Sequence, residues 1–329
     1  MRGLARPLAL AGLLAASTLS AGCLGTRPSR GEEGVVELAW AGGVLGCIFG
    51  CDADAPMVAD GRAYLTVVNA DELPDFTVES DAPEVMSATR ADPESSTVVL
   101  ESSAAGRAKV LFRRASSGEV FDRFLIYVHD VDRVELDQDD LYAEAFTIMV
   151  GGESTIYFDL RDTKDHDLQG IGGVTYSLSG QITADELDLF DAIGQALVGA
   201  LLGSNHESVA IEALGVGSGE ILVEAASGAA LAVPVTVVDE AAVTRVEVSG
   251  EEDPPVVGVT YSVHADAFAG AEEVRSPACA WTLDPPDGAV EVRSATRSAI
   301  SVVSEVPASA AVTCTIGGVS GRYDVAFGG

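Results

Sequence analysis

The sequence is poor in basic residues, and this shortage excludes one class of partner. Of its 329 residues, 19 are lysine or arginine and 51 are aspartate or glutamate, which gives a formal net charge of −32. Proteins that bind nucleic acid need lysine and arginine to neutralise the phosphate backbone, and an acidic surface repels it. Nucleic acid is therefore excluded as a partner. The acidity favours solubility and says nothing about the fold.

Histidine and tryptophan are also scarce. The four histidines stand singly in the sequence: His129, His166, His206 and His264. Zinc sites need closely spaced ligands, and none of these histidines lies in a recognisable catalytic context. Trp40 and Trp281 are too few for the exposed aromatic platforms that favour carbohydrate binding. We therefore expect no enzymatic activity and no cofactor, with calcium as the one ion to consider.

The apolar run of residues 8–19 is too short to span a bilayer, which takes about 20 residues. It follows two arginines, Arg2 and Arg6, and ends at small residues before Cys23, which is the layout of a secretory signal. The stretch Leu19-Ser20-Ala21-Gly22-Cys23 resembles the lipobox of bacterial lipoproteins, although Ser20 stands where that family usually has leucine. The alternative is ordinary cleavage of a secretory signal.

The lipobox resemblance implies that residues 1–22 are a signal peptide and that Cys23 carries acyl chains such as palmitate. Two or three chains anchor durably, because each buried CH₂ contributes about 0.8 kcal/mol. Residues 23–34 are then a flexible polar tether. Leu24 in place of the aspartate linked to inner-membrane retention favours the outer membrane. The bilayer is thus one expected partner, reached through Cys23.

Four cysteines remain after Cys23, and an even number in an exported chain favours two disulfides. Three connectivities are possible. We prefer Cys47–Cys51 with Cys279–Cys314, because each pair then lies inside one expected domain.

Alternating apolar residues and turn signals such as Ser117-Gly118 and Ser227-Gly228 predict an all-β fold of antiparallel sandwiches. A parallel α/β fold would need a helix between successive strands. Internal repeats divide the chain: the segments 128–136 and 238–248 are alike, and Ser87-Ala88-Thr89-Arg90 recurs as Ser294-Ala295-Thr296-Arg297. We expect domains at residues 35–131, 132–241 and 242–329.

Each expected domain contains a strand headed by an aromatic residue, and the first two then continue into a strand such as Gly106-Arg107-Ala108-Lys109-Val110. This order resembles bacterial Ig-like domains of the group 2 and invasin type. The resemblance implies three tandem Ig-like β-sandwiches. In the third, Cys279 just before Trp281, with Cys314 on a late strand, resembles an Ig-like disulfide packed near a core tryptophan.

One segment of the middle domain is not strand-like. Thr183 and Glu186 form a capping box, and apolar residues then recur at helical spacing, so we expect an amphipathic helix at 184–202. It either closes the end of the sandwich or docks a partner through Leu197 and Leu201.

Two acidic sets are candidate calcium sites, because calcium prefers carboxylate oxygens. The first is the loop containing Asp159, Asp162, Asp165 and Asp167, in which Arg161 and Lys164 offer internal neutralisation, so that a solvated loop is the favoured interpretation. The second set lies at the first domain junction and consists of Asp130, Asp132, Asp137, Asp139 and Asp140.

Together these features predict a membrane-anchored lipoprotein of the bacterial cell envelope, in the outer membrane and either periplasmic or surface-exposed. Its Ig-like domains would act as a binding or adhesion module for a protein partner. The alternative is a structural spacer without a specific ligand.

Overall fold

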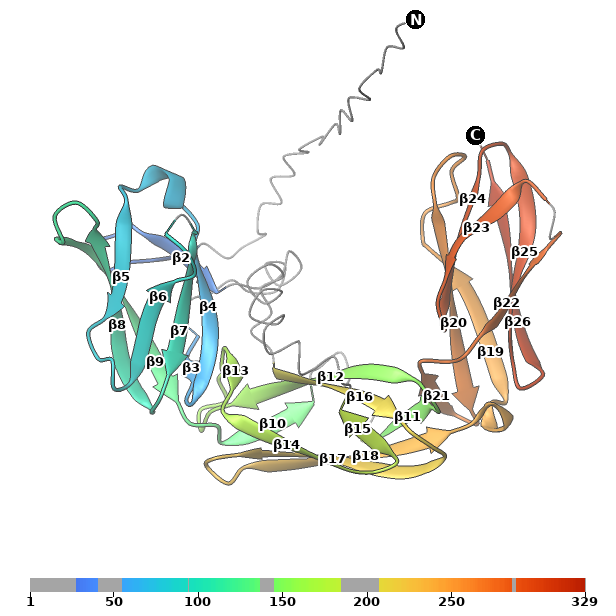
Figure 1. The fold of residues 1–329 in the computed structure, drawn as a ribbon, viewed down its shortest axis with the longest axis horizontal. Coiled ribbons are helices and arrows are strands. Elements are labelled where there is room, and N and C mark those ends of the chain that lie inside the picture. Colours follow the sequence, from blue (N-terminus) through green and yellow to red (C-terminus); the bar gives the residue numbers. More distant parts are fainter. Residues whose placement is uncertain are drawn as a thin grey trace, which may run out of the picture.

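The computed structural model describes residues 28–40, 55–93, 95–136, 145–184, 207–285 and 288–328. These residues form three β-sandwiches in tandem, which we name unit 1 (28–129), unit 2 (133–238) and unit 3 (245–328). Figure 1 shows units 1 and 3 extending from the two ends of unit 2 on the same side. The prediction of an all-β fold of tandem Ig-like sandwiches is confirmed. No helix within the described ranges has the length and apolarity needed to cross a membrane.

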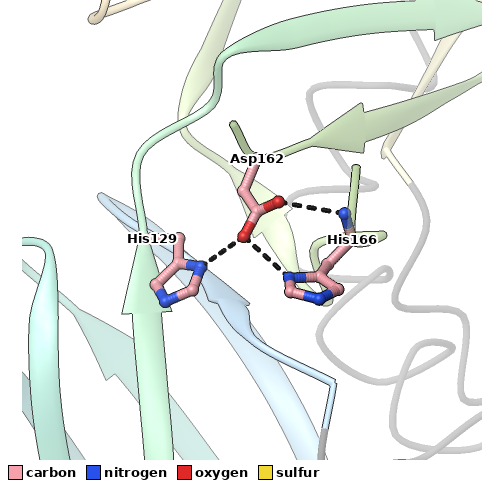
Figure 2. A group of neighbouring side chains, drawn as sticks. All are labelled: His129, Asp162 and His166. Carbon is pink, nitrogen blue, oxygen red and sulfur yellow. Dashed lines mark hydrogen bonds and ion pairs between the residues drawn. The ribbon is translucent and has the colours of Figure 1, made fainter. Parts of the chain in front are cut away.

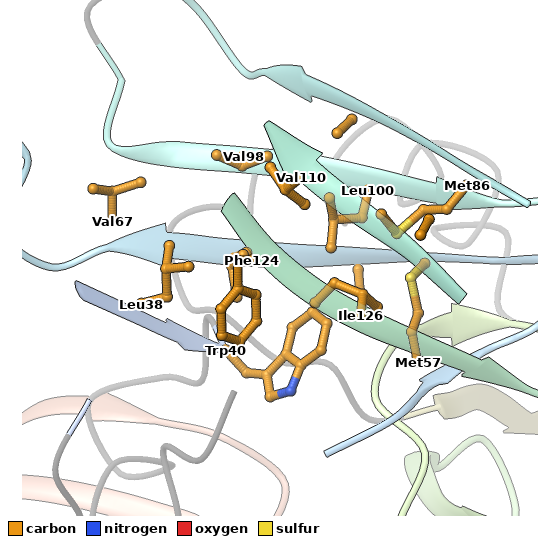
Figure 3. Close-up of a cluster of buried hydrophobic side chains, with 14 of the residues drawn as sticks. Leu38, Trp40, Met57, Val67, Met86, Val98, Leu100, Val110, Phe124 and Ile126 are labelled. Carbon is orange, nitrogen blue, oxygen red and sulfur yellow. The ribbon is translucent and has the colours of Figure 1, made fainter. Parts of the chain in front are cut away.

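Unit 1 has two facing sheets. Its elements are β1 (Ser29–Arg30), β2 (Glu37–Trp40), β3 (Met57–Val58), β4 (Gly61–Val67), the 3-10 turn η1 (Ala70–Glu72), β5 (Phe76–Ser80), β6 (Met86–Arg90), β7 (Thr97–Ser102), β8 (Gly106–Arg114) and β9 (Val120–His129). One sheet has the order β1-β2-β4-β7-β6 and the other β3-β9-β8-β5. Alternate residues of β8, Ala108, Val110 and Phe112, point into the core because successive side chains of a strand face opposite ways. Trp40 and Met57 belong to the same core (Figure 3).

Unit 2 repeats the arrangement. Its elements are β10 (Arg133–Leu136), β11 (Phe146–Met149), β12 (Glu153–Arg161), β13 (Ile171–Gly172), β14 (Val174–Gly180), β15 (Ile182–Ala184), β16 (Glu207–Ala213), β17 (Gly217–Ala225) and β18 (Ala230–Val238). The 3-10 turn η3 (Glu240–Ala242) follows and leads into unit 3. The sheet β10-β12-β16-β15 faces the strands β14-β17-β18-β11. Ile156, Phe158 and Val235 are among the buried residues between them.

Unit 3 completes the chain. Its strands are β19 (Arg245–Gly250), β20 (Tyr261–Ala269), β21 (Glu272–Arg275), β22 (Ala280–Asp284), β23 (Val290–Ala295), β24 (Ala299–Ser304), β25 (Ala308–Ile316) and β26 (Val319–Phe327). The sheet β22-β25-β26 faces the strands around β20 and β24.

Three strand pairs depart from the expected antiparallel pattern. β3 runs parallel to β9, and β11 runs parallel to both β18 and β21. In unit 2 the chain leaves β10 in one sheet and enters the other as β11, beside the last strand of the unit. Alternation of apolar residues predicts which face of a strand is buried but not the direction of its neighbour, so the sequence could not reveal these pairs.

The helix expected at 184–202 is not confirmed. Thr183, its expected capping residue, and Ala184, its expected first residue, belong to β15 and pair with Glu212 and Ile211 of β16. The β-branched side chains at the start of β15 favour a strand. The rest of the segment, including Leu197 and Leu201, lies outside the described residues.

Candidate functional site

Units 1 and 2 are joined by strand pairing. β13 of unit 2 pairs with β4 of the unit 1 sheet beyond the end of β2, with Ile171 opposite Arg62 and Gly172 opposite Gly61. Next to it, the Val58 N–H donates to the carbonyl of Gln169 at 3.0 Å. The Val58 side chain packs in the core of unit 2, although Val58 is a residue of β3. Backbone hydrogen bonds and core packing therefore both cross this junction.

Glycine is required where the two backbones meet. Gly173 has φ +77, and a Cβ there would lie 2.6 Å from Val58 Cγ2 and 2.7 Å from the Ala59 carbonyl oxygen. Only a residue without a side chain fits this approach.

A buried carboxylate supports the same junction from unit 2. Glu207 accepts a hydrogen bond from the Tyr176 hydroxyl at 2.7 Å and one from the Gly172 N–H at 2.6 Å. Burial raises the pKa of Glu207, and these two bonds offset only part of that effect. β13, which pairs with unit 1, is thus hydrogen-bonded to Glu207, whose ionisation is disfavoured by burial.

Two histidines and one aspartate gather at this junction (Figure 2). His129 ends β9 in unit 1, Asp162 follows β12, and His166 lies four residues later in unit 2. Asp162 Oδ2 lies 2.6 Å from His129 Nδ1 and 3.0 Å from His166 Nδ1. The turn that holds Asp162 and His166 together is closed by the Asp162 N–H donating to the His166 carbonyl at 3.1 Å.

Asp162 is the buried centre of this group. Its side chain is 3% exposed, against 29% for His129 and 52% for His166. Burial acts to raise the pKa of Asp162, but hydrogen bonds from the His166 backbone and ring, from the His129 ring and from the Lys164 N–H outweigh it and hold the pKa well below its usual range. Asp162 is therefore a carboxylate at neutral pH. Within the described part of the chain, these three residues are the group suited to hold a metal ion.

The structure does not gather the four carboxylates of the predicted calcium loop around a common point. Asp162 faces the two histidines, whereas Asp167 and Asp159 lie 3.0 and 3.7 Å from the guanidinium of Arg161. Asp165 pairs with Arg161 at 3.7 Å and also with Arg133. A guanidinium thus lies among these acids. Of the second acidic set, Asp130 and Asp132 are exposed, and Asp137, Asp139 and Asp140 lie outside the described residues.

Units 2 and 3 are joined in a similar way. β21 of unit 3 pairs with β11, with Thr147 opposite Val274, so that one sheet runs through both units. Met149 of β11 packs in a core cluster of unit 3. The Arg297 guanidinium donates to the Val150 carbonyl across the junction at 3.1 Å.

The Cys279–Cys314 disulfide is present, with a Cα–Cα distance of 5.1 Å. It differs from the Ig-like bond that the resemblance implied. Cys279 immediately precedes β22, which is the neighbour of β25 in the same sheet, and Trp281 lies directly opposite Cys314. Trp281 is half-buried, and its Nε1 donates to the Thr296 carbonyl. Cys23, Cys47 and Cys51 lie outside the described residues.

The end of unit 3 farthest from unit 2 exposes apolar side chains. Val256 and Val259 lie in the loop between β19 and β20, and Val306 lies in the loop between β24 and β25. Their exposed fractions are 53%, 55% and 50%. The two loops are held together by the Gly258 N–H, which donates to the Ser304 carbonyl at 2.8 Å. We name this surface the valine tip.

No family model and no curated protein matches the sequence. Solved structures do match. Domains 4–9 of the surface layer protein SbsC are 15% identical, covering 89% of this chain and 47% of that one, at a TM-score of 0.31. The Escherichia coli adhesin FdeC is 12% identical, covering 84% and 95%, at a TM-score of 0.26. The D0-D1 domain of intimin is 14% identical, covering 60% and 98%, at a TM-score of 0.22. The chain spans about half the length of the SbsC structure, and TM-scores this low support no functional argument.

Proposed function

We propose that this chain is a membrane-anchored lipoprotein of the bacterial cell envelope whose Ig-like units act as a binding or adhesion module for a protein partner. The anchor is the acylated Cys23. The tether expected at residues 23–34 is shorter than the sequence predicted, because Ser29 and Arg30 form β1 and pair with β2. The outer membrane is its proposed location. The module works by recognition and not by catalysis.

The valine tip carries the proposal of a binding surface. Apolar side chains that are half exposed and adjacent mark interaction sites more often than isolated ones do. The same two loops carry exposed acids: Glu251, Glu252, Asp253 and Glu305, the last paired with Arg293 at 3.8 Å. An apolar centre within an acidic rim suits a protein surface with an apolar centre and a basic rim, because complementary charge speeds and orients association.

The fixed array supports the same proposal. Both junctions are held by paired strands, so the tip is presented on a scaffold of defined shape. A pre-organised surface loses less conformational freedom on binding than a loose one.

The anchor is tested by expressing the full chain and its Cys23→Ser variant and separating membrane from soluble fractions. We expect the native chain in the membrane fraction with acyl chains on Cys23 by mass spectrometry, and the variant in the soluble fraction. A native chain that is processed elsewhere, or that has a free thiol at Cys23, would refute the anchor.

Binding is tested by capturing partners from envelope extracts with the full chain and identifying them by mass spectrometry. A Val256→Asp/Val259→Asp variant should lose the partner, whereas Leu214→Asp/Val216→Asp should keep it. Leu214 and Val216 are 56% and 61% exposed in unit 2 and control for the two added charges. Equal melting temperatures would show that the variants remain folded. Retention of the partner by the tip variant would contradict the proposed surface, and the absence of any specific partner would favour a structural spacer.

A further inference from the structure

We propose that His129, Asp162 and His166 form a binding site for one zinc-like divalent ion between units 1 and 2. The three residues each offer one ligand atom within 4.8 Å of the other two. We assign these atoms as His129 Nδ1, Asp162 Oδ2 and His166 Nδ1, because both Nδ1 atoms already contact Oδ2. This proposal is independent of the adhesive function proposed above.

The spacing of the three atoms is close to what a tetrahedral ion requires. Ligands about 2.0 to 2.1 Å from zinc in tetrahedral geometry are roughly 3.3 Å apart. Oδ2 of Asp162 is 2.6 Å from one imidazole nitrogen and 3.0 Å from the other. These two distances are shorter than that spacing by less than 1 Å, and both rings are partly exposed, so they have room to move outward on their solvent side.

The donor set selects the ion. Two imidazole nitrogens and one carboxylate oxygen suit zinc, copper(II) or nickel(II), whereas calcium takes oxygen ligands and does not prefer imidazole. Three protein ligands leave a fourth position for water, and the exposed side of His166 provides the way in.

The carboxylate is already held in the orientation that a ligand needs. Asp162 Oδ1 accepts the N–H of Lys164 at 2.8 Å and that of His166 at 2.9 Å, which leaves Oδ2 for the ion. Such outer hydrogen bonds orient metal ligands and are part of the site. They arise from a turn in which Asp165 has φ +68.

Ion binding replaces the two hydrogen bonds between the rings and Asp162. Without an ion, each ring donates its Nδ1 proton to Oδ2. With an ion, Nδ1 gives its lone pair to the metal, and a neutral ring carries its proton on Nε2. A ring that was doubly protonated releases one proton to solvent. Because His129 belongs to unit 1 and the other two ligands to unit 2, the ion would clamp the junction.

Calorimetric titration of the full, tag-free chain with zinc sulfate tests the site. We expect one zinc per chain, and no heat of binding from calcium chloride at the same concentrations. His129→Gln and His166→Gln should each weaken zinc binding by at least about 100-fold, more than the roughly 10- to 100-fold that loss of an outer hydrogen-bond partner costs. His264→Gln is the matched control, because His264 is exposed on β20 of unit 3.

Long-range ¹H–¹⁵N spectra of the imidazoles give a readout that does not depend on stability. On adding zinc, His129 and His166 should both become Nε2-protonated with a metal-bound Nδ1, while His264 stays unchanged. Absence of zinc binding up to 100-fold molar excess would overturn the proposal. So would unchanged affinity in either ligand variant, or an equal loss of affinity in His264→Gln.

Discussion

Substitution of Asp122 on β9 should lower the stability of unit 1 strongly. Its side chain is fully buried, and it accepts four backbone hydrogen bonds. Oδ2 accepts the N–H groups of Val35 and Val36, at 2.8 and 2.7 Å, and Oδ1 accepts those of Glu33 and Arg123, at 2.9 and 2.8 Å. The carboxylate thus fixes the turn that leads into β2.

The substitution Asp122→Asn isolates the charge with little change in size. Asparagine keeps one acceptor oxygen, so two of the four bonds are lost, and each bond to a charged group contributes about 1.5 to 3 kcal/mol. Relief from burying a charge offsets part of the loss. We expect the free energy of unfolding of unit 1 to fall by about 3 kcal/mol, which lowers Tm by about 12 °C or more for a unit of this size.

The effect should depend on pH in a defined direction. Burial acts to raise the pKa of Asp122, but its backbone hydrogen bonds outweigh this and hold the pKa below the ordinary value. A group with a lowered folded pKa stabilises fully above its unfolded pKa, about 3.9, and this contribution is lost as pH falls through the folded value. The difference in Tm between native chain and variant should be complete at pH 7 and should narrow below about pH 4.

Scanning calorimetry of the full chain measures both effects. Asp81→Asn is the control, because the exposed Asp81 accepts one backbone N–H from the described residues, that of Lys109 at 2.7 Å, and should cost less than about 1 kcal/mol. A Tm for Asp122→Asn within about 2 °C of the native value at pH 7 would refute the reasoning, since even 1 kcal/mol moves Tm by about 4 °C or more.

Two further predictions concern the junction between units 1 and 2. Because burial raises the pKa of Glu207, the folded state holds its proton at pH values where the unfolded chain has lost it, so unit 2 should gain stability as pH falls from 7 toward the ordinary pKa of glutamate, about 4.3. Glu207→Gln should remove this gain. Urea unfolding of both chains at the two pH values measures the free energy of unfolding, and an equal change with pH in both chains would contradict the prediction. Gly173→Ala should speed hydrogen exchange of residues 56–63 and 167–173, because the new methyl group meets Val58 and the Ala59 carbonyl. Gly118→Ala, at a similar φ of +71 with nothing within 4 Å, should leave their exchange unchanged.

The sequence predicted the parts of the fold that depend on which face of a strand is buried. The repeated Ser-Ala-Thr-Arg illustrates both the success and its limit. Its first copy lies in β6 and its second runs out of β23, two strands at comparable places in their units. Arg90 stays within unit 1, with its guanidinium 4.2 Å from the Phe76 ring centroid, whereas Arg297 reaches Val150 in unit 2. The repeat predicted position but not contacts.

The candidate metal group could not be predicted, because its parts are remote in the chain. His129 and Asp162 are 33 residues apart, and they meet because β10, which follows β9, pairs with β12 so that Arg133 lies opposite Arg161. The spacing of Asp162 and His166 was the one local signal. Similarly, the carboxylates of the predicted calcium loop looked convergent in sequence, but the structure places Arg161 among them. Which side chains converge depends on long-range pairing that alternation of apolar residues does not encode.

The nine-stranded sheet that runs from unit 2 into unit 3 has a mechanical consequence. A linker of a few residues would let neighbouring units swing, whereas here any swing must stretch ladder hydrogen bonds and shear the packing around Met149. Load applied at the far end of unit 3 is therefore transmitted to unit 2 as torque instead of being absorbed by bending at a joint. Units 1 and 3 therefore stay at a constant separation, so a partner that contacts both must fit that distance.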